Sequence, residues 1–360
     1  MFGQILTGLA QPFVLAAPTR YSDLWFTESG RVSATAIASL ANPFGGAVSI
    51  PLLKSDIQLH KIDTTQLAQL VNPSLGSVPD IVLYVAIIST IATLPSLFIP
   101  AKPPTPPSAS SEVLKVALVP SLKKCLRSPP FYIVFITFST YVGFFNSFSS
   151  LLNQILYPYA YSEDEAGICG AILIVVGLVA AAITSPIFDR THAYLKGIKI
   201  LCTLIALAYL ALIWAPQTRG LAAPYVLSAV EGAASFSLLP ISLEYLVEIT
   251  FPASPEVSST ICWAGGQLFG GIFIVIMNAL KDQRPVNLAV VRELGRGAGG
   301  DSRPPGNMFR ALVFQGALAL AVLPLPLMLG IKRLGLAHGE GRLKVDEHRN
   351  ESLVEGEEGT

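Results

Sequence analysis

The sequence predicts an all-α integral membrane protein with about nine transmembrane helices. Only 13% of the 360 residues are charged, whereas an ordinary soluble domain carries about 25%. Hydrophobic residues make up 52% of the chain. A helix needs about 20 apolar residues to cross a bilayer, and windows of about this length recur along the sequence. They are Phe2–Thr19, Val32–Leu53, Ile81–Ala101, Ser128–Ser162, Ala166–Phe188, Ile200–Thr218, Gly220–Leu243, Val257–Leu280 and Ala311–Ile331.

The same composition argues against several other classes of protein. The 24 basic and 24 acidic residues leave no net charge, whereas a nucleic-acid-binding protein would carry a basic excess. The four cysteines show no C-x-x-C spacing, so neither a metal site nor a disulfide is expected. No catalytic or phosphate-binding motif is visible. We therefore expect no enzyme, no catalytic residue and no cofactor. The expected partners are the lipid bilayer and a small-molecule substrate, and no obligate protein partner is evident.

A proline-rich stretch divides the chain. Residues 1–100 hold three windows and form a partial N-terminal transmembrane half. Residues 101–127 form a Pro-rich, basic linker, whose lysines alternate with apolar residues as in an amphipathic helix lying at the membrane face. Residues 128–332 hold six windows and form a C-terminal transmembrane half. Residues 333–360 mix charges and are expected to be a disordered, solvated tail.

Basic residues in the loops predict the orientation of the helices. The loops alternate between two sets, which carry 15 and 9 of the 24 Lys and Arg residues. Because cytoplasmic loops are enriched in Lys and Arg, the first set is expected in the cytosol. It includes the loop at 20–31, the linker, the loop at 189–199 and the tail. The sequence leaves open whether the membrane is the plasma membrane or that of an organelle.

Three glutamates stand out within the spans. Glu231 lies near the middle of its window, where a charge costs about 2.5–3.5 kcal/mol on insertion scales. It is either a coupling site for a proton or cation, or a neutral, hydrogen-bonded residue at a helix contact. Glu244 and Glu248 repel each other at i, i+4 spacing, so a basic partner is expected. Arg190, next to Asp189, and Lys196 are expected on the same side of the membrane as these glutamates. Salt bridges between them either latch a closed state, or the charged side chains merely face water at the end of the helix.

Two windows carry polar stripes at helical spacing. The first contains Asn146 and Asn153, with Gln154 beside it, and the second contains Trp263 and Gln267. Each stripe faces either an aqueous cavity or a neighbouring helix packed through small residues. Gly266 and Gly270 favour packing. Gln267 beside Trp263 favours contact with a ligand, because a large amide next to an aromatic ring is a poor packing device.

Several runs resemble the feline leukaemia virus subgroup C receptor-related transporters of the major facilitator superfamily. These runs are Gln11–Pro12, Leu24–Phe26, Ser150–Gln154, Glu244–Pro252 and Gly266–Gly270. The resemblance implies a bundle of twelve helices in two six-helix halves, of which this chain would hold helices 4–12, lacking the first three. It also implies a function in haem export or in choline or ethanolamine uptake.

The resemblance also implies positions for the binding site. The family's choline site uses aromatic residues and two glutamines; Gln267 matches one of these, whereas Pro43 stands at the position of the other. Asn146 stands where choline-transporting members have Tyr.

The functional hypothesis is a secondary active or facilitative transporter of a small solute, working by alternating access. Asn146, Asn153 and Gln267 would line the cavity, while Glu244, Glu248 and Arg190 would form a cytosolic gate. The Asp189–Arg190 loop resembles the superfamily's gate motif. The alternatives are a receptor-like membrane protein that transports nothing, with the basic Lys281–Arg310 loop as its best support, and an inactive truncated product.

Overall fold

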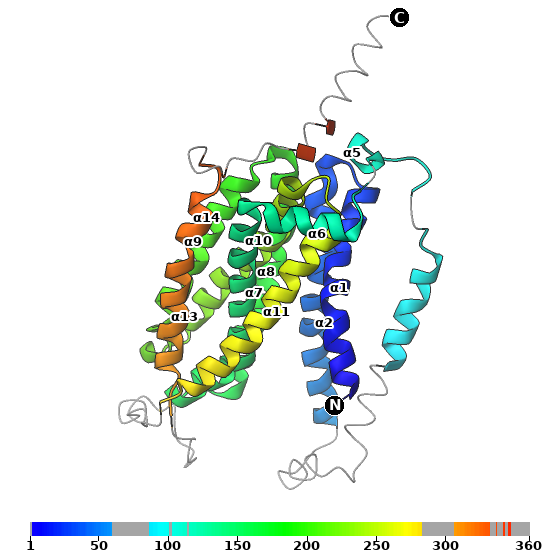
Figure 1. Ribbon diagram of the computed structural model, residues 1–360. Helices are drawn as coiled ribbons and strands as arrows, with labels where there is room; N and C mark the ends of the chain where they lie inside the picture. Colours follow the sequence, from blue (N-terminus) through cyan, green and yellow to red (C-terminus); the bar gives the residue numbers. More distant parts are fainter. Residues whose placement is uncertain are drawn as a thin grey trace, which may run out of the picture. The chain divides into compact units, whose positions relative to one another are not determined.

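The computed structural model describes residues 2–59, 86–100, 103–113, 115–282, 306–331, 336, 341–342 and 345–346 (Figure 1). The chain divides into two compact units. The first unit comprises Met1–Phe44 and Pro106–Thr360, and the second comprises Gly45–Thr105. Both candidate functional regions considered below lie within the first unit.

Almost all described residues of the first unit are helical. Its helices are α1 (Phe2–Trp25), the beginning of α2 (Arg31–Leu59), α5 (Ala109–Glu112), α6 (Leu118–Arg127), α7 (Pro129–Leu156), α8 (Glu163–Thr191), α9 (Tyr194–Leu212), α10 (Ala222–Thr250), α11 (Pro255–Ala279), α13 (Phe309–Val322) and α14 (Pro324–Met328). Short 3-10 turns lie between several of them, at Glu28–Gly30, Tyr157–Tyr159 and Ala215–Thr218. In the second unit, α2 continues to Leu59 and a helical segment covers Ala86–Phe98.

The helices have the lengths and composition expected of an integral, multi-pass membrane protein. Six of the described helical stretches are long and apolar enough to cross a bilayer, and they coincide with the last six predicted windows. α1 and α2 occupy the first two windows. The third window, Ile81–Ala101, lies partly outside the described residues, so the count of nine stays a prediction.

Local signals in the sequence set the helix boundaries. α8 begins with a capping box, in which the Ser162 hydroxyl accepts from the Glu165 amide and the Glu165 carboxylate accepts from the Ser162 amide. α7 and α11 each have Pro at their first position, where its fixed φ suits a helix and its missing N–H is not needed. α8 ends at Thr191 and is followed by His192, which adopts a left-handed conformation.

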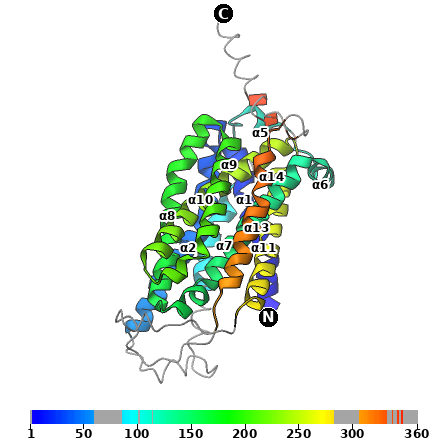
Figure 2. The same ribbon diagram turned by 90° about the vertical axis from the view of Figure 1, so that its left-hand side faces the viewer.

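Small residues allow the long helices to approach closely. α8 packs on α10, α7 on α11, and α9 lies beside α13 (Figure 1, Figure 2). A Cβ on Gly266 would meet the side chain of Val142, and one on Gly270 would come within 3.0 Å of Asn146. The predicted packing role of both glycines is confirmed.

An aromatic cluster forms the centre of the first unit. The ring of Phe144 on α7 lies 5.2 Å from that of Tyr209 on α9 and 5.1 Å from that of Phe273 on α11. Such contacts add to the stability gained by burying the rings. The cluster fixes α7, α9 and α11 relative to one another.

α6 occupies the basic stretch in which an amphipathic helix was predicted. It lies across one end of the long helices (Figure 1). Leu118, Val119 and Leu126 are exposed, as are the interleaved basic residues Lys123 and Lys124. Burial raises the pKa of the Cys125 thiol to about 11, so this cysteine stays protonated at neutral pH.

Gly232 and Gly271 provide a matched test of the α8–α10 contact. Replacing Gly232 with Ala places a Cβ against the backbone carbonyl of Leu173, whereas Gly271 has open space around it. Overpacking of this kind costs about 1–3 kcal/mol, so we expect Gly232→Ala to lower the thermal midpoint of the purified protein in detergent. Gly271→Ala should leave it unchanged or raise it, because Ala favours helices. Equal midpoints would show that α8 and α10 do not pack this closely.

Candidate functional site

A cavity of about 230 Å³ lies between α1 and α2 on one side and α7, α10 and α11 on the other. Its polar lining consists of amides and hydroxyls: Gln11, Ser39, Asn42, Asn146, Ser235 and Gln267. Its aromatic lining consists of Phe138, Tyr141, Phe145, Phe236 and Trp263. None of the described lining residues is Asp, Glu, Lys or Arg. The cavity therefore offers neutral hydrogen-bonding groups and ring faces to a small molecule.

Two amides from different helices meet at the cavity wall. The side-chain N–H of Asn146 on α7 donates to the carbonyl oxygen of Gln267 on α11, at 3.3 Å. An amide group has both donors and acceptors, so this contact orients both side chains and leaves the Gln267 amide nitrogen as a donor. The structure thus brings together two of the predicted binding residues.

Trp263 forms an aromatic wall beside these amides. Its ring packs edge-on against Phe138, with centroids 5.3 Å apart and an interplanar angle of 87°. The indole N–H is buried and finds no acceptor among the described residues. Because an indole N–H is a donor that is usually satisfied when buried, an acceptor on a bound molecule would complete this side of the cavity.

Asn153 and Gln154 do not line the cavity, contrary to the sequence-based prediction. Both side chains are exposed near the end of α7. The lining residues of α7 end at Asn146, and Asn153 lies two helical turns further on. Helical spacing predicted the correct face of α7 but not the depth at which the cavity ends.

Gln11 on α1 also lines the cavity and was not predicted to do so. The only signal in the sequence was a polar amide interrupting an apolar run. Pro43, which stands where the family resemblance placed a second glutamine, also lines the cavity.

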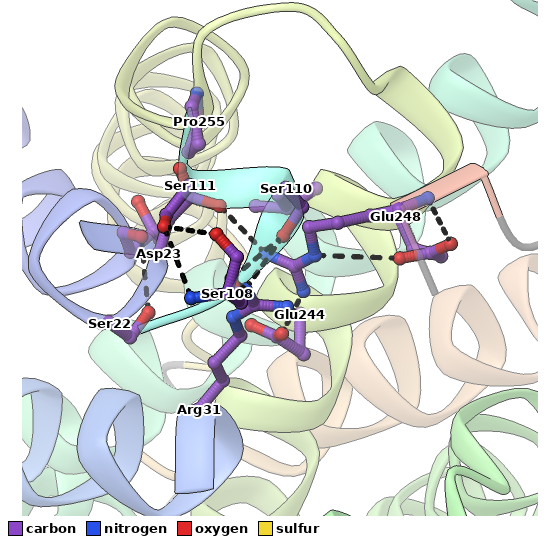
Figure 3. A network of polar contacts seen from close by, with 12 residues as sticks. Ser22, Asp23, Arg31, Ser108, Ser110, Ser111, Glu244, Glu248 and Pro255 are labelled. Atoms are coloured by element: carbon purple, nitrogen blue, oxygen red, sulfur yellow. Dashed lines mark hydrogen bonds and ion pairs between the residues drawn. The ribbon is translucent and has the colours of Figure 1, made fainter. Parts of the chain in front are cut away.

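A network of buried charges lies at the end of the first unit that carries the linker (Figure 3). Its centre is Arg342, which is 1% exposed. The guanidinium contacts Asp23 of α1 at 3.2 Å, Glu248 of α10 at 3.6 Å, and Glu244 of α10. The backbone N–H of Arg342 also donates to Glu248, at 2.8 Å. One cation from the tail therefore joins α1 to α10.

The protonation of this cation follows from its neighbours. Burial of the guanidinium lowers the pKa of Arg342, but the carboxylates of Glu244, Asp23 and Glu248 outweigh that effect and raise the pKa above its ordinary value. Arg342 therefore stays charged, as three adjacent carboxylates require.

A second cation connects α2 to the linker and the tail. Arg31 is fully buried and pairs with Asp346 at 3.0 Å. It also donates to the hydroxyls of Ser108 and Ser110, at 2.6 and 2.8 Å. Lys115 of the linker contacts Asp23 at 3.1 Å; burial lowers the pKa of Lys115, and the attraction of Asp23 opposes that shift.

Asp189 joins α8 to the beginning of α2. Its carboxylate accepts from the backbone N–H groups of Val32 and Ser33, at 2.8 and 2.9 Å, and from the Ser33 hydroxyl. A carboxylate at this position satisfies unpaired N–H groups and interacts favourably with the helix dipole.

The gate predicted from the sequence is corrected in two respects. A basic partner for Glu244 and Glu248 is present, but it is Arg342, whereas Arg190 and Lys196 are exposed. The tail at 333–360 was expected to be disordered and solvated, yet Arg342 and Asp346 are buried. Two buried carboxylates require a cation, but the sequence contains many cations and does not indicate which one folds back.

Comparison with known proteins identifies the family. The model of the Major Facilitator Superfamily matches residues 1–275. The chain belongs to the major facilitator superfamily. The crystal structure of another protein, the E. coli fucose:proton symporter FucP, has the same fold, with a TM-score of 0.60 and 15% identity over 88% of this chain and 73% of FucP.

Several curated proteins are similar to this superfamily member in sequence. Solute carrier family 49 member A3 of Danio rerio is 32% identical, over 78% of this chain and 57% of its own length. The choline/ethanolamine transporter FLVCR1 of Felis catus is 29% identical, over 78% of this chain and 50% of its own. The human choline/ethanolamine transporter FLVCR2 is 25% identical, over 82% of this chain and 57% of its own length. The chain thus spans about half the length of these relatives.

Substitutions of Arg342 and Arg190 distinguish the charge network found in the structure from the gate predicted from the sequence. Arg342→Ala leaves buried carboxylates uncompensated, which typically costs about 3–5 kcal/mol, so we expect a marked fall in the thermal midpoint. Arg190→Ala removes an exposed cation and should change the midpoint little. Adding Glu244→Gln and Glu248→Gln to Arg342→Ala should restore part of the loss. If Arg190→Ala were the more damaging change, the assignment of Arg342 would be wrong.

Proposed function

We propose that this protein is a transporter rather than an enzyme, and that it moves a small solute across the membrane by alternating access. The observation that carries the proposal is the relation between the cavity and the charge network. α1 and α2 meet α10 and its neighbours around the cavity, and the network joins the same two groups of helices at one end. Membership of the major facilitator superfamily supports this function.

The network acts as the gate in this proposal. For the cavity to open toward the linker and tail, the contacts of Arg342 with Asp23 and of Asp189 with α2 must break. Water would then hydrate the separated charges, which lowers the cost of parting them. In this proposal, the ion pairs close the cavity at that end, which the loop charges assign to the cytosol. Rocking of the two helix groups about the cavity would open the cavity on one side of the membrane while closing it on the other.

The cavity lining favours a small, hydroxylated ammonium compound as the solute. Ring faces attract ammonium groups, and the amides of Gln267 and Asn146 supply partners for a hydroxyl. The relatives named as choline/ethanolamine transporters support the same class. Asn146 replaces the family's tyrosine, so this protein's preference between choline and ethanolamine need not match theirs.

The receptor-like alternative rests on the basic loop between Lys281 and Arg310. Most of this loop lies outside the described residues. The alternative predicts binding without movement of solute, and a transport assay therefore decides between the two hypotheses.

Replacing Gln267 or Gln154 with Ala tests whether the cavity binds the transported solute, because only Gln267 lines it. Loss of one hydrogen bond to a neutral ligand costs about 0.5–1.5 kcal/mol, so we expect Gln267→Ala to lower kcat/KM up to about tenfold. Gln154→Ala, at an exposed site, should transport like the parent protein. The measurement is uptake of labelled choline and ethanolamine by cells that express the full-length protein. Equal uptake by both variants would remove Gln267 from the binding site, and absence of uptake by the parent would exclude this solute class.

A further inference from the structure

Glu231 is a buried carboxyl group that neither the cavity lining nor the charge network uses. It lies in the middle of α10 and is 3% exposed. One carboxyl oxygen accepts from the hydroxyl of Ser235 at 3.0 Å. The other oxygen is buried and makes no hydrogen bond of ordinary geometry to a described residue.

Among the described residues, none supplies a countercharge to Glu231. The titratable groups that face it are the phenols of Tyr209 on α9 and Tyr141 on α7. The Tyr209 hydroxyl is likewise buried without a hydrogen bond of ordinary geometry to a described residue. α7 carries no charged residue, and those of the other helices packed against α10 lie toward helix ends: Arg20, Asp23, Glu163, Asp164, Glu165, Asp189, Arg190, Lys196, Lys199 and Glu256. An ionised Glu231 would therefore be an unpaired charge inside the bilayer, which is strongly unfavourable.

A proton fits this position better than a metal ion. Hard cations require a shell of several oxygen ligands, and no group of three His, Cys, Asp or Glu residues that could hold a metal ion occurs among the described residues. A proton needs one oxygen on Glu231 and one acceptor. The hydroxyl of Tyr209, on the adjacent helix, is available for that role.

Ser235 connects this carboxyl group to the cavity. Its hydroxyl donates to Glu231, and Ser235 is also one of the residues that line the cavity, together with Trp263 and Gln267. The two residues are one helical turn apart on α10. Water in an open cavity would thus reach Glu231 through a single side chain.

We propose that Glu231 binds and releases a proton through the cavity, so that solute movement is coupled to proton movement. The proposal rests on the transport function proposed above. In the binding step, the carboxylate takes a proton from a hydronium ion in the cavity; one O–H bond forms on Glu231, one breaks on the hydronium ion, and water remains. The neutral acid suits the closed packing of α10, whereas the carboxylate requires a hydrated, open cavity. Protonation therefore biases the exchange between conformations.

Infrared spectroscopy tests the proton site without reference to any solute. The full-length protein in lipid nanodiscs should show an absorption band of a buried protonated carboxyl group that disappears as pH rises. Glu231→Gln should lack this band, and Glu163→Gln, which changes an exposed carboxylate, should retain it. Glu231→Asp, which keeps an acid group, should show the band at a shifted frequency and serves if Glu231→Gln does not fold. An unchanged band in Glu231→Gln or in Glu231→Asp would overturn the proposal.

Proteoliposomes test the coupling. With a pH-sensitive dye inside and choline as the probe, the parent protein should produce a choline-driven pH change. Glu231→Gln should lose it while still exchanging labelled choline across the membrane. Choline flux in the parent protein that ignores an imposed pH gradient would overturn the coupling. If the parent moves no choline, the proposed solute class fails, and the infrared band still decides whether Glu231 holds the proton.

Discussion

The structure depends on the compensation of charge at one end of the bundle. Asp23 on α1 and Glu244 and Glu248 on α10 belong to one polar network (Figure 3). All three are buried, and they meet around the guanidinium of Arg342. Without that cation, the carboxylates would repel one another and α1 could not pack beside α10. Because α1 and α10 bound the cavity, we propose that the same ion pairs control whether the cavity is closed at this end.

A gate made of charges differs in an important way from one made of apolar side chains. Buried ion pairs contribute little net stability, because the cost of removing charges from water nearly cancels their attraction. Opening to water repays much of that cost, so the closed and open arrangements can lie close in free energy while each remains specific. A gate of this kind suits a protein that must change between two conformations repeatedly.

The sequence predicted some features well because they depend on local or averaged properties. The apolar windows predicted the helices, and helical spacing placed Gln267, Trp263 and Asn146 on faces that meet. The partner of Glu244 was not predictable, because Arg342 is 98 residues away along the chain. Asp189 was associated with the gate, but its role as an N-terminal cap of α2 depends on packing that no local pattern encodes. Asn153 and Gln154 show that periodicity gives a face and not a depth.

The contrast between the two ends of α10 separates two kinds of chemistry. Glu244 and Glu248 pair with Arg342 of the tail, and these ion pairs link α10 to α1 through Asp23. Glu231 lies among neutral side chains, so its charge can exist only when water enters the cavity. One helix thus carries ion-paired side chains at the proposed gate and, beside the cavity, a carboxyl group that has no such partner among the described residues. Because both lie on α10, a change in protonation at Glu231 would, in the proposed mechanism, alter the balance of the ion pairs at the gate without any direct contact between them.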